Sequence, residues 1–272
     1  MNDTQISGEA TDPDETRASR AEDGRLVGAD RVLAVLKELA RYPDGAGLDE
    51  MTRAIGSPKP TVHRALGTLR RAGLADQDDQ GRYVLGDEFL RMAFAHHEAR
   101  PEHVRIRPVL ETLAARFGET AHYAVLDGRE VVYRAKVDPP TGAVRLTSTI
   151  GGRNPAHATG VGKLLLAHRL DTLEAVEKWI GDEPPACRTP RTLCTADALH
   201  REFETIREQG YAVDDQENEV GVNCIALPVY TTSRLVPSGA VSVSALTYRT
   251  SPQTLIDEVD DIRRALGHLG AA

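Results

Sequence analysis

The spacing of apolar residues divides the chain into a short helical region with a hairpin and a longer region in which strands and helices alternate. Three early segments carry apolar residues three and four positions apart, the spacing that lines one side of an α-helix. These predicted helices cover residues 30–41, 48–55 and 58–72. Two short segments, 74–77 and 82–85, flank a turn that ends at Gly81 and predict a β-hairpin. Three helices followed by a hairpin are typical of a winged helix-turn-helix domain.

The third predicted helix has two different faces. Its apolar residues belong to a core and are Val62, Ala65, Leu66 and Leu69. At 100° per residue the opposite face is centred on Arg64, Gly67 and Arg71. That face is polar and basic, so we expect an anionic partner there.

The ends of this helix are indicated by its flanking residues. Ser57 is a favourable N-cap, and Pro58 and Pro60 fall in the first turn, where a missing N–H costs little. Gly73 is the expected C-cap.

A further helix is predicted over residues 87–97, after the hairpin. Its apolar face packs either on a second copy of the chain or on its own winged helix, and the sequence leaves both arrangements open. A second domain begins near Pro101 with a helix that ends near Phe117.

Strands and helices alternate through the rest of the chain. The predicted strands are 120–127, 130–137, 144–150, 221–230 and 239–248, and the predicted helices are 160–168, 172–180, 196–209 and 252–269. Strands separated by helices, with an antiparallel hairpin between the first two, predict an α+β sensor-like domain.

Charge sharpens the prediction for the first domain. Residues 51–75 contain five basic side chains and no Asp or Glu, within a chain whose net charge is −8. A basic stripe in an acidic protein indicates a confined contact with a polyanion, and in a winged helix this partner is DNA. The structural alternative is a solvated basic helix in an ordinary helical bundle.

Composition sets the broad class of protein. The chain has 272 residues, 40% hydrophobic and 27% charged, which is typical of a globular protein long enough for two domains. No apolar run approaches the roughly 18 residues that a transmembrane helix needs, and no signal peptide is recognisable, so we expect a cytoplasmic protein. Residues 1–25 carry seven acidic residues and three arginines, and predict a disordered acidic tail.

The cysteines and histidines predict no metal site. Cys187, Cys194 and Cys224 lack the paired close spacing of a zinc site, and the nine histidines form no ligand pattern. We expect the three cysteines to be free thiols, and we expect no cofactor.

Small and polar residues in the second domain indicate a ligand site. Residues 154–163 lead from a loop into a helix start containing Gly160 and Gly162, where free N–H groups and the helix dipole favour an anion such as a carboxylate. The alternative is that both glycines only allow close packing of the helix on the sheet. Ser242 and Ser244 lie two apart in a strand and therefore share one face.

The chain after the predicted tail resembles the IclR-type bacterial transcriptional regulators. The most specific resemblance is Gly210-x3-Asp214-x2-Glu217-x6-Cys224, followed by Ile225-Ala226-Leu227-Pro228-Val229. Residues 58–64 resemble the recognition helix of that family, and residues 157–163 resemble its effector-loop motif.

The resemblance implies an α+β multidomain chain with a GAF-like α/β effector domain that binds small acids. The implied regions are a tail over 1–25, a winged helix-turn-helix over 26–86, a dimerising linker helix over 87–100 and the effector domain over 101–272. Carried over by position, the effector contacts are Leu146, Asn154, Gly160, Val161, Asp214, Cys224, Ser242 and Ser244. Gly160 and Val161 would contribute backbone N–H groups, and Leu146 and Asn154 the wall that selects the substituent.

Two residues depart from the pattern of the family. Pro60 stands where a small hydroxyl residue is usual, which removes one expected phosphate contact. Asn154 stands where an apolar residue is common, and this more polar wall favours a hydroxylated effector such as a sugar acid over an aromatic acid.

The sequence thus predicts a DNA-binding transcriptional regulator, most simply a repressor, that acts as a homodimer or tetramer and responds to a small carboxylate. The expected DNA contacts are Ser57, Lys59, Thr61, His63, Arg64, Thr68, Arg71 and wing residue Arg82. The alternatives are an activator that responds to an aromatic acid and a ligand sensor without DNA. A catalytic role for Cys224 with His157, or for Asp214 with Glu217, is a further alternative, but we expect no enzyme, because nothing in the sequence orients a base or supplies an oxyanion hole.

Overall fold

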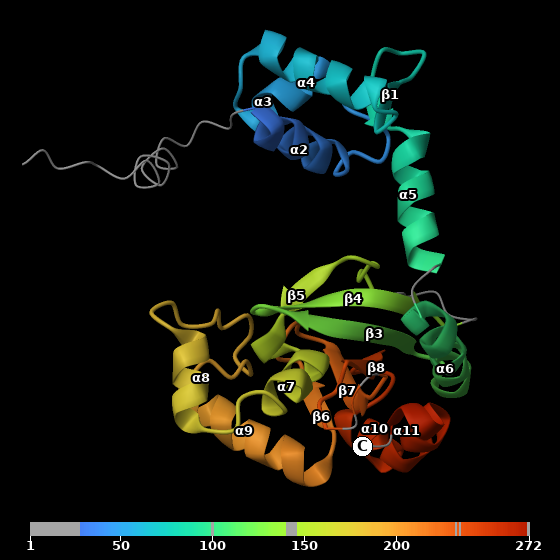
Figure 1. The fold of residues 1–272 in the computed structure, drawn as a ribbon. Helices are drawn as coiled ribbons and strands as arrows, with labels where there is room; N and C mark the ends of the chain where they lie inside the picture. Colours follow the sequence, from blue (N-terminus) through green and yellow to red (C-terminus); the bar gives the residue numbers. More distant parts are fainter. Residues whose placement is uncertain (1–27, 99–100, 140–145, 232, 234, 271–272) are drawn as a thin grey trace, which may run out of the picture. The chain divides into compact units, whose positions relative to one another are not determined.

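The computed structural model describes residues 28–98, 101–139, 146–231, 233 and 235–270. The chain forms two compact units that divide between His97 and Glu98 (Figure 1). The acidic tail predicted over residues 1–25 lies outside the described residues. Within the described part of the chain, no helix combines the length and the apolar character needed to cross a membrane.

The first unit has the predicted order of three helices and a hairpin. It contains α2 (Gly28–Leu39), α3 (Leu48–Ile55), α4 (Lys59–Arg71), β1 (Ala75–Gln77) and β2 (Tyr83–Leu85), with β1 and β2 antiparallel. The apolar side chains of these elements form one core, which consists of Val35, Leu39, Ala46, Met51, Val62, Ala65, Leu66, Leu69, Ala75 and Tyr83. This core contains the whole predicted apolar face of α4, so the opposite face points to solvent. Helix α5 (Asp87–Glu98) follows the hairpin.

The start of α4 differs from the prediction. Ser57 is not the N-cap, because the chain is still extended at Pro58 (φ −55°, ψ 138°), which takes the cap position without a side-chain hydrogen bond. The C-cap is Ala72 and not Gly73 as predicted; Gly73 follows it in the left-handed region (φ 70°), which ends the helix.

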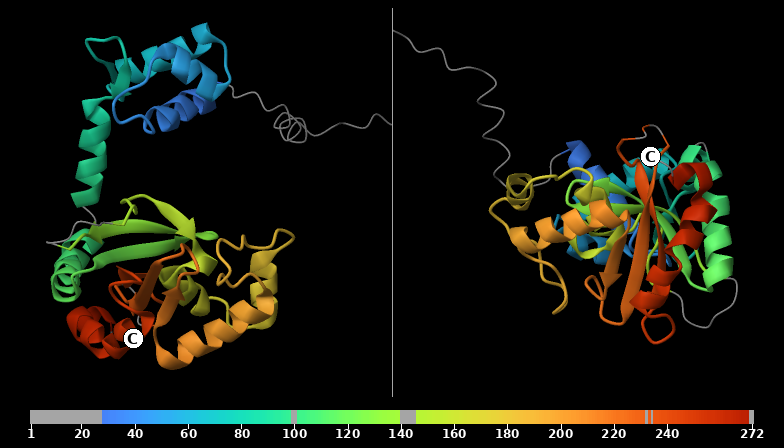
Figure 2. Two further views of the ribbon diagram at one scale, coloured as in Figure 1. Left: turned by 180° about the vertical axis from the view of Figure 1, so that it is seen from behind. Right: turned by 90° about the horizontal axis from the view of Figure 1, so that it is seen from below.

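The second unit is built on one six-stranded antiparallel sheet. Its strands are β3 (Thr120–Asp127), β4 (Glu130–Val137), β5 (Arg153–Pro155), β6 (Ala212–Asp215), β7 (Val222–Val229) and β8 (Gly239–Leu246), in the order β5-β4-β3-β8-β7-β6. Helices cover both faces, as Figures 1 and 2 show: α6 (Pro101–Phe117), α10 (Pro252–Asp257) and α11 (Val259–Leu266) on one, and α7 (Gly160–Ala167), α8 (Leu173–Ile180) and α9 (Ala196–Gln209) on the other. Short 3₁₀ helices η2 (Ala156–Ala158) and η3 (Gly267–Gly270) complete the unit.

Each face of the sheet has its own hydrophobic cluster. The face toward α6, α10 and α11 carries larger side chains, among them Tyr123, Ile225 and Val243. The face toward α7 carries small residues such as Ala124, Ala226 and Ala240, and these let the helix approach the strands closely.

Two predicted elements of the second unit need correction, and two short strands were not predicted. Of the strand predicted over 144–150, the described residues 146–150 are not in a strand, because Lys136 Nζ donates to the carbonyl oxygens of Leu146 and Ser148, each at 2.8 Å. The edge strand β5 forms a few residues later instead. The short strand β6 was not predicted either. The last predicted helix is two helices and a 3₁₀ turn, because the chain at Glu258 makes an i→i+3 bond to Leu255 O (3.3 Å).

The prediction of three free thiols is wrong. Cys187 and Cys194 form a disulfide, and among the described cysteines only Cys224 is free. The intervening chain folds back on itself where Thr189 N donates to Thr192 Oγ1 (2.9 Å), so the two Cα atoms lie 5.7 Å apart, within the range that a disulfide needs.

Candidate functional sites: a basic helix face and a polar pocket

The outward face of α4 presents the side chains that the sequence predicts for DNA contact. Lys59, His63, Arg64, Thr68 and Arg71 are exposed, and Ser57 and Thr61 are partly buried at the start of the helix. Thr68 Oγ1 donates to Arg64 O and accepts a bond from Arg71 Nη2, both at 3.0 Å. This places a hydroxyl and a guanidinium side by side on the helix surface.

Lys59 and Arg82 also have partners within the unit. Lys59 pairs with Asp49 on α3, and both side chains are exposed, so a DNA phosphate competes with that carboxylate. The guanidinium of Arg82 is partly buried and donates to the carbonyl oxygen of Gly45, which ties the wing to the loop before α3. The wing turn itself carries Asp78 and Asp79. The observed arrangement therefore gives Arg82 a structural role in the wing.

A polar patch on the α7 face of the sheet defines the second site. Strand pairing sets Asp214 opposite Cys224 and Cys224 opposite Ser244, which makes one row across β6, β7 and β8. The next row on the same face pairs Ser242 with His122 on β3. The register thus gathers residues that are far apart in the sequence.

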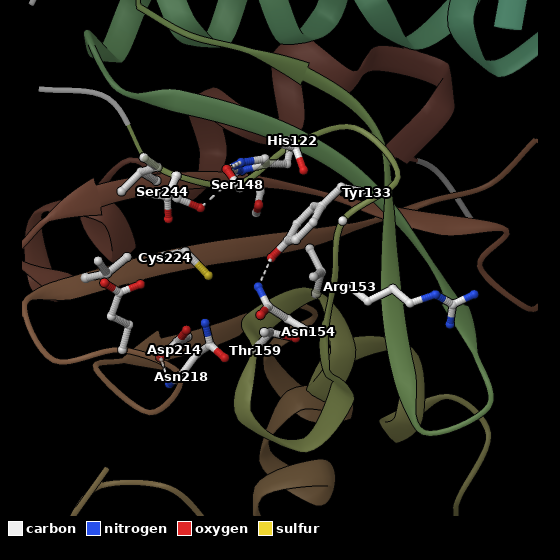
Figure 3. A pocket seen from close by; sticks show the side chains of 18 of the residues that line it. His122, Tyr133, Ser148, Arg153, Asn154, Thr159, Asp214, Asn218, Cys224 and Ser244 are labelled. Atoms are coloured by element: carbon white, nitrogen blue, oxygen red, sulfur yellow. Dashed lines mark hydrogen bonds between the residues drawn. The ribbon is translucent and has the colours of Figure 1, made fainter. Parts of the chain in front are cut away.

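These residues line a cavity of about 500 Å³ (Figure 3). Seven of the eight predicted effector residues line it: Leu146, Asn154, Val161, Asp214, Cys224, Ser242 and Ser244. Gly160 is the exception and lies directly behind Cys224. Several polar residues of the lining were not predicted, namely His122, Tyr133, Ser148, Thr149, Thr159, Arg188, Asn218 and Glu219.

Neutral hydrogen-bonding groups make up one wall of the cavity. His122 Nε2 lies 2.7 Å from Ser148 Oγ, and Nδ1 lies 3.4 Å from Ser244 Oγ (Figure 3). Burial lowers the pKa of His122 to about 3, and the positive charge of Lys136 acts in the same direction, so the imidazole is neutral near pH 7. Asn154 Nδ2 donates to Tyr133 Oη at 3.2 Å on the adjoining wall.

Asp214 is the central acidic group of the opposite wall. Its Oδ1 accepts the N–H of Glu217 (2.7 Å) and of Asn218 (3.4 Å), which closes the turn after β6. Burial raises the pKa of the Asp214 carboxyl to about 7, and the nearby Glu217 adds to that rise against the opposing hydrogen bonds. Asp214 is therefore poised between its neutral and charged forms at neutral pH.

Both glycines of α7 are required by close packing. A Cβ at Gly162 would lie 2.1 Å from Ala156 O, and a Cβ at Gly160 would lie 2.9 Å from Cys224 Sγ. Close packing therefore requires both glycines, and a contact of the Gly160 N–H with an effector stays a prediction. Thr159 caps the helix by accepting a hydrogen bond from Gly162 N (3.1 Å), and Val161 lines the cavity.

A buried ionic cluster supports the Asp214 turn from behind. Lys163 on α7 is fully buried between Glu202 (2.7 Å) and Glu217. Burial opposes the charge of Lys163, but the two carboxylates together raise its pKa, so the ammonium stays charged. This cluster joins α7, α9 and the turn that holds Asp214.

The geometry argues against the catalytic alternatives. Burial and the Asp214 charge raise the pKa of Cys224 to about 12, so the sulfur is a thiol at neutral pH and a poor nucleophile. The ring of His157 bonds the Ala186 carbonyl oxygen through Nε2 (3.0 Å), and Glu217 is held by Lys163. Within the described chain, no cluster of three or more His, Cys, Asp or Glu side chains is arranged to hold a metal ion.

Comparison with known families decides between the remaining function classes. Residues 28–79 match the IclR helix-turn-helix domain, and residues 103–267 match the family described as bacterial transcriptional regulator IclR C-terminal. The chain belongs to the IclR family. It is accordingly a DNA-binding transcriptional regulator whose second unit is an IclR effector domain, which binds small-molecule ligands.

Relatives of this IclR-family regulator extend over almost its whole length. It is 32% identical to the HTH-type transcriptional regulator XynR of Escherichia coli, over 88% of this chain and 94% of XynR. An IclR regulator structure from Alicyclobacillus acidocaldarius gives a TM-score of 0.74 at 24% identity, covering 88% of this chain and 96% of that one. An IclR homologue from Microbacterium hydrocarbonoxydans, solved with 4-hydroxybenzoate, gives 0.70 at 23% identity, covering 87% and 97%. At these identities the two structures show a shared fold.

His122, Tyr133 and Arg188 illustrate why some pocket residues of this IclR-family chain could not be predicted. His122 and Tyr133 lie in strands that were predicted correctly, and their position opposite Ser242 and Ala124 follows from strand register, which no local pattern reveals. Arg188 lies in an irregular segment, where spacing carries no signal. A polar residue within an otherwise apolar strand, such as His122 in 120–127, was the one available sign.

Proposed function

We propose that this regulator is a repressor that binds a pseudo-palindromic operator as a homodimer and is controlled by a small hydroxylated carboxylate, a sugar acid in class. The observation that carries the effector class is the cavity itself. Neutral hydrogen-bonding groups, the Ser148–His122–Ser244 set and the Asn154–Tyr133 pair, face it along one wall. These groups hydrogen-bond one another, and their hydroxyl and amide oxygens keep further acceptor capacity with which they can bind the hydroxyls of a ligand.

On the DNA side, the exposed α4 face enters the major groove. Lys59, Thr61 and Arg71 contact phosphates, with Ser57 beside them, and His63, Arg64 and Thr68 approach base edges. Arg82 remains a proposed phosphate contact of the wing, although its bond to Gly45 O leaves fewer donors for that contact.

On the effector side, the carboxylate lies toward the start of α7, near Val161 N–H and Asp214. The protonated form of Asp214 donates a hydrogen bond to it. The hydroxyl-bearing end lies toward Ser148 and Ser244. Effector binding shifts the population of conformations that place the two DNA-binding units for the operator.

An aromatic acid is the second candidate effector. The rings of His122 and Tyr133 lie with centroids 4.9 Å apart and form a flat part of the wall. The homologue solved with 4-hydroxybenzoate shows that this fold holds such an acid in one family member. The neutral polar wall favours the sugar acid because a phenolic acid leaves more of its groups without partners.

Calorimetric titration of the full chain tests the effector class. D-gluconate, D-galacturonate and 4-hydroxybenzoate serve as probes, each beside the Ser242→Ala variant, whose side chain is buried in the cavity wall. We expect a hydroxylated acid to bind the unmodified protein and Ser242→Ala to bind it at least tenfold more weakly, with operator affinity unchanged. Ser233→Ala, on an exposed loop, is the control. Equal binding by wild type and Ser242→Ala would move the effector site elsewhere.

A further inference from the structure

Two arginines line the cavity, and they differ in their partners. Arg153 pairs with Asp127 and Glu130, with N–O distances of 2.5 and 3.0 Å, and its side chain points away from the cavity (Figure 3). Arg188 makes one hydrogen bond, from Nε to Asn218 O at 3.0 Å, and no ion pair with a carboxylate of the described chain. The terminal nitrogens of Arg188 are therefore available to a ligand.

A cation at the cavity would favour the binding of an acid. Asp214 and Glu219 also line it, and two carboxyl groups repel an anionic ligand in proportion to their ionisation. Arg188 is tied through Asn218 to the Asp214 turn, and its charge also acts on His157, just before α7. It thus lies at the side of the cavity where the turn and the start of α7 meet.

The chain on both sides of Arg188 is held in place. Thr189 is buried and its Oγ1 donates to Gln216 O at 2.7 Å, while Thr192 Oγ1 donates to Glu217 O at 2.6 Å. Before Arg188, the carbonyl of Ala186 is bonded by His157 Nε2 (3.0 Å), and Cys187 is joined to Cys194. A side chain with a fixed backbone loses less entropy when it binds, which favours a role in recognition.

We propose that Arg188 binds the carboxylate of the effector and is the residue that makes the pocket select acids over neutral analogues, with the Cys187–Cys194 disulfide as its positioning element. The inference rests on the proposed function, because it requires a carboxylate effector. A guanidinium meets a carboxylate with two parallel N–H···O bonds, a geometry that a neutral amide or alcohol cannot match.

The test compares each acid with a neutral counterpart of the same shape. The full chain is titrated calorimetrically with D-gluconate and D-gluconamide and with 4-hydroxybenzoate and 4-hydroxybenzamide. In the wild type we expect an acid to bind more tightly than its amide. In Arg188→Gln we expect the acid to lose about tenfold to a hundredfold in affinity and the amide to be unchanged. Arg188→Lys should recover part of the preference.

Arg191→Gln is the matched control, because Arg191 lies on the same loop, is exposed and pairs with Asp215 outside the cavity. The double variant Cys187→Ser/Cys194→Ser should also reduce the preference for the acid over its amide. The same two substitutions in the Arg188→Gln background should cause no further reduction. If Arg188→Gln keeps the full preference for an acid that binds, the role of Arg188 is overturned while the carboxylate effector stands. If wild type binds every amide as well as its acid, the carboxylate class itself fails.

Discussion

At the scale of single residues, the effector site depends on how burial treats ionisable groups. Burial keeps His122 neutral and Cys224 in its thiol form, and it raises the pKa of Asp214 to about 7. Lys163 stays charged only because two carboxylates surround it. The cavity therefore offers mostly neutral donors and acceptors, with Asp214 as the group whose charge changes most readily near physiological pH.

Acid binding should depend on pH through Asp214. Because burial raises its pKa to about 7, the carboxyl is neutral below that pH and charged above it. A ligand carboxylate is favoured by the neutral form, so acid affinity should fall as pH rises from about 6 to about 8. Calorimetry over this range should show the fall in wild type and its loss in Asp214→Asn. An equal pH slope in both proteins would contradict the assignment.

The same group affects the free energy of unfolding. Its pKa is raised from the ordinary value of 3.8 for an aspartate to about 7, so the folded state binds more protons between these values. The stabilisation by protonated Asp214 is complete below about pH 4 and is lost as pH rises through 7. Denaturant unfolding of Asp214→Asn, compared with wild type across this range, should show a smaller decline for the variant. If the free energy of unfolding of Asp214→Asn falls as steeply with pH as that of wild type, a group other than Asp214 causes the fall.

At the scale of elements, α7 depends on glycines that leave no space for a side chain. In Gly162→Ala the new Cβ meets the backbone of Ala156, which must shift, so the second unit should lose about 1–3 kcal/mol or more of stability. Gly67→Ala in α4 is the contrasting control, since its Cβ meets only Arg71 Nη1 at 3.8 Å and helix propensity gains about 0.5–1 kcal/mol. Thermal unfolding measures both changes. A Gly162→Ala protein of unchanged stability would contradict the packing account.

Helix α4 carries the second prediction at this scale. Arg64→Ala should weaken operator binding by about 1–3 kcal/mol and reduce discrimination between operator and mutated half-sites. Arg41→Ala removes the same charge from an exposed residue at the end of α2, which pairs only with Glu38. Fluorescence anisotropy on both DNAs separates the effects. If Arg64→Ala and Arg41→Ala reduce binding equally on operator and scrambled DNA, Arg64 does not read bases.

Apolar residues at helical spacing and apolar strand-like runs predicted most elements. The predicted apolar residues of α4 lie in the core of the first unit, and strands β3, β7 and β8 form where apolar runs predicted them, buried on both faces of the sheet. The prediction of a strand over 144–150 was wrong because a distant side chain bonds the backbone there. Lys136 Nζ donates hydrogen bonds to the carbonyl oxygens of Leu146 and Ser148, which are then not available for strand pairing. The Cys187–Cys194 disulfide was not predicted because the geometry of the loop brings the two residues together, and sequence spacing does not reveal that geometry.

At the scale of the whole molecule, each of the two units has its own core, and α5 carries exposed apolar side chains. Leu90, Met92 and Phe94 are 45%, 53% and 61% exposed. Leu90 and Phe94 lie four residues apart and share one side of the helix. In the proposed homodimer, this side of α5 packs against a second copy of the chain.

Phe94→Glu should therefore shift the protein from dimer to monomer and weaken operator binding. Sedimentation equilibrium measures the first effect and anisotropy the second. Arg91→Ala, on the same helix, removes only a surface pair with Glu88 and should leave the dimer intact. A Phe94→Glu protein that remains dimeric and binds DNA normally would place the dimer contact elsewhere.

The most direct test of the central claim is operator binding by the full chain with and without acid. DNA from upstream of its own gene is titrated against salt, then with D-gluconate, D-galacturonate and 4-hydroxybenzoate. The account predicts sequence-preferring binding with a steep salt dependence, which a hydroxylated acid releases and its neutral analogue does not. Binding that is equal on scrambled DNA, or that no acid changes, would contradict the proposed regulation.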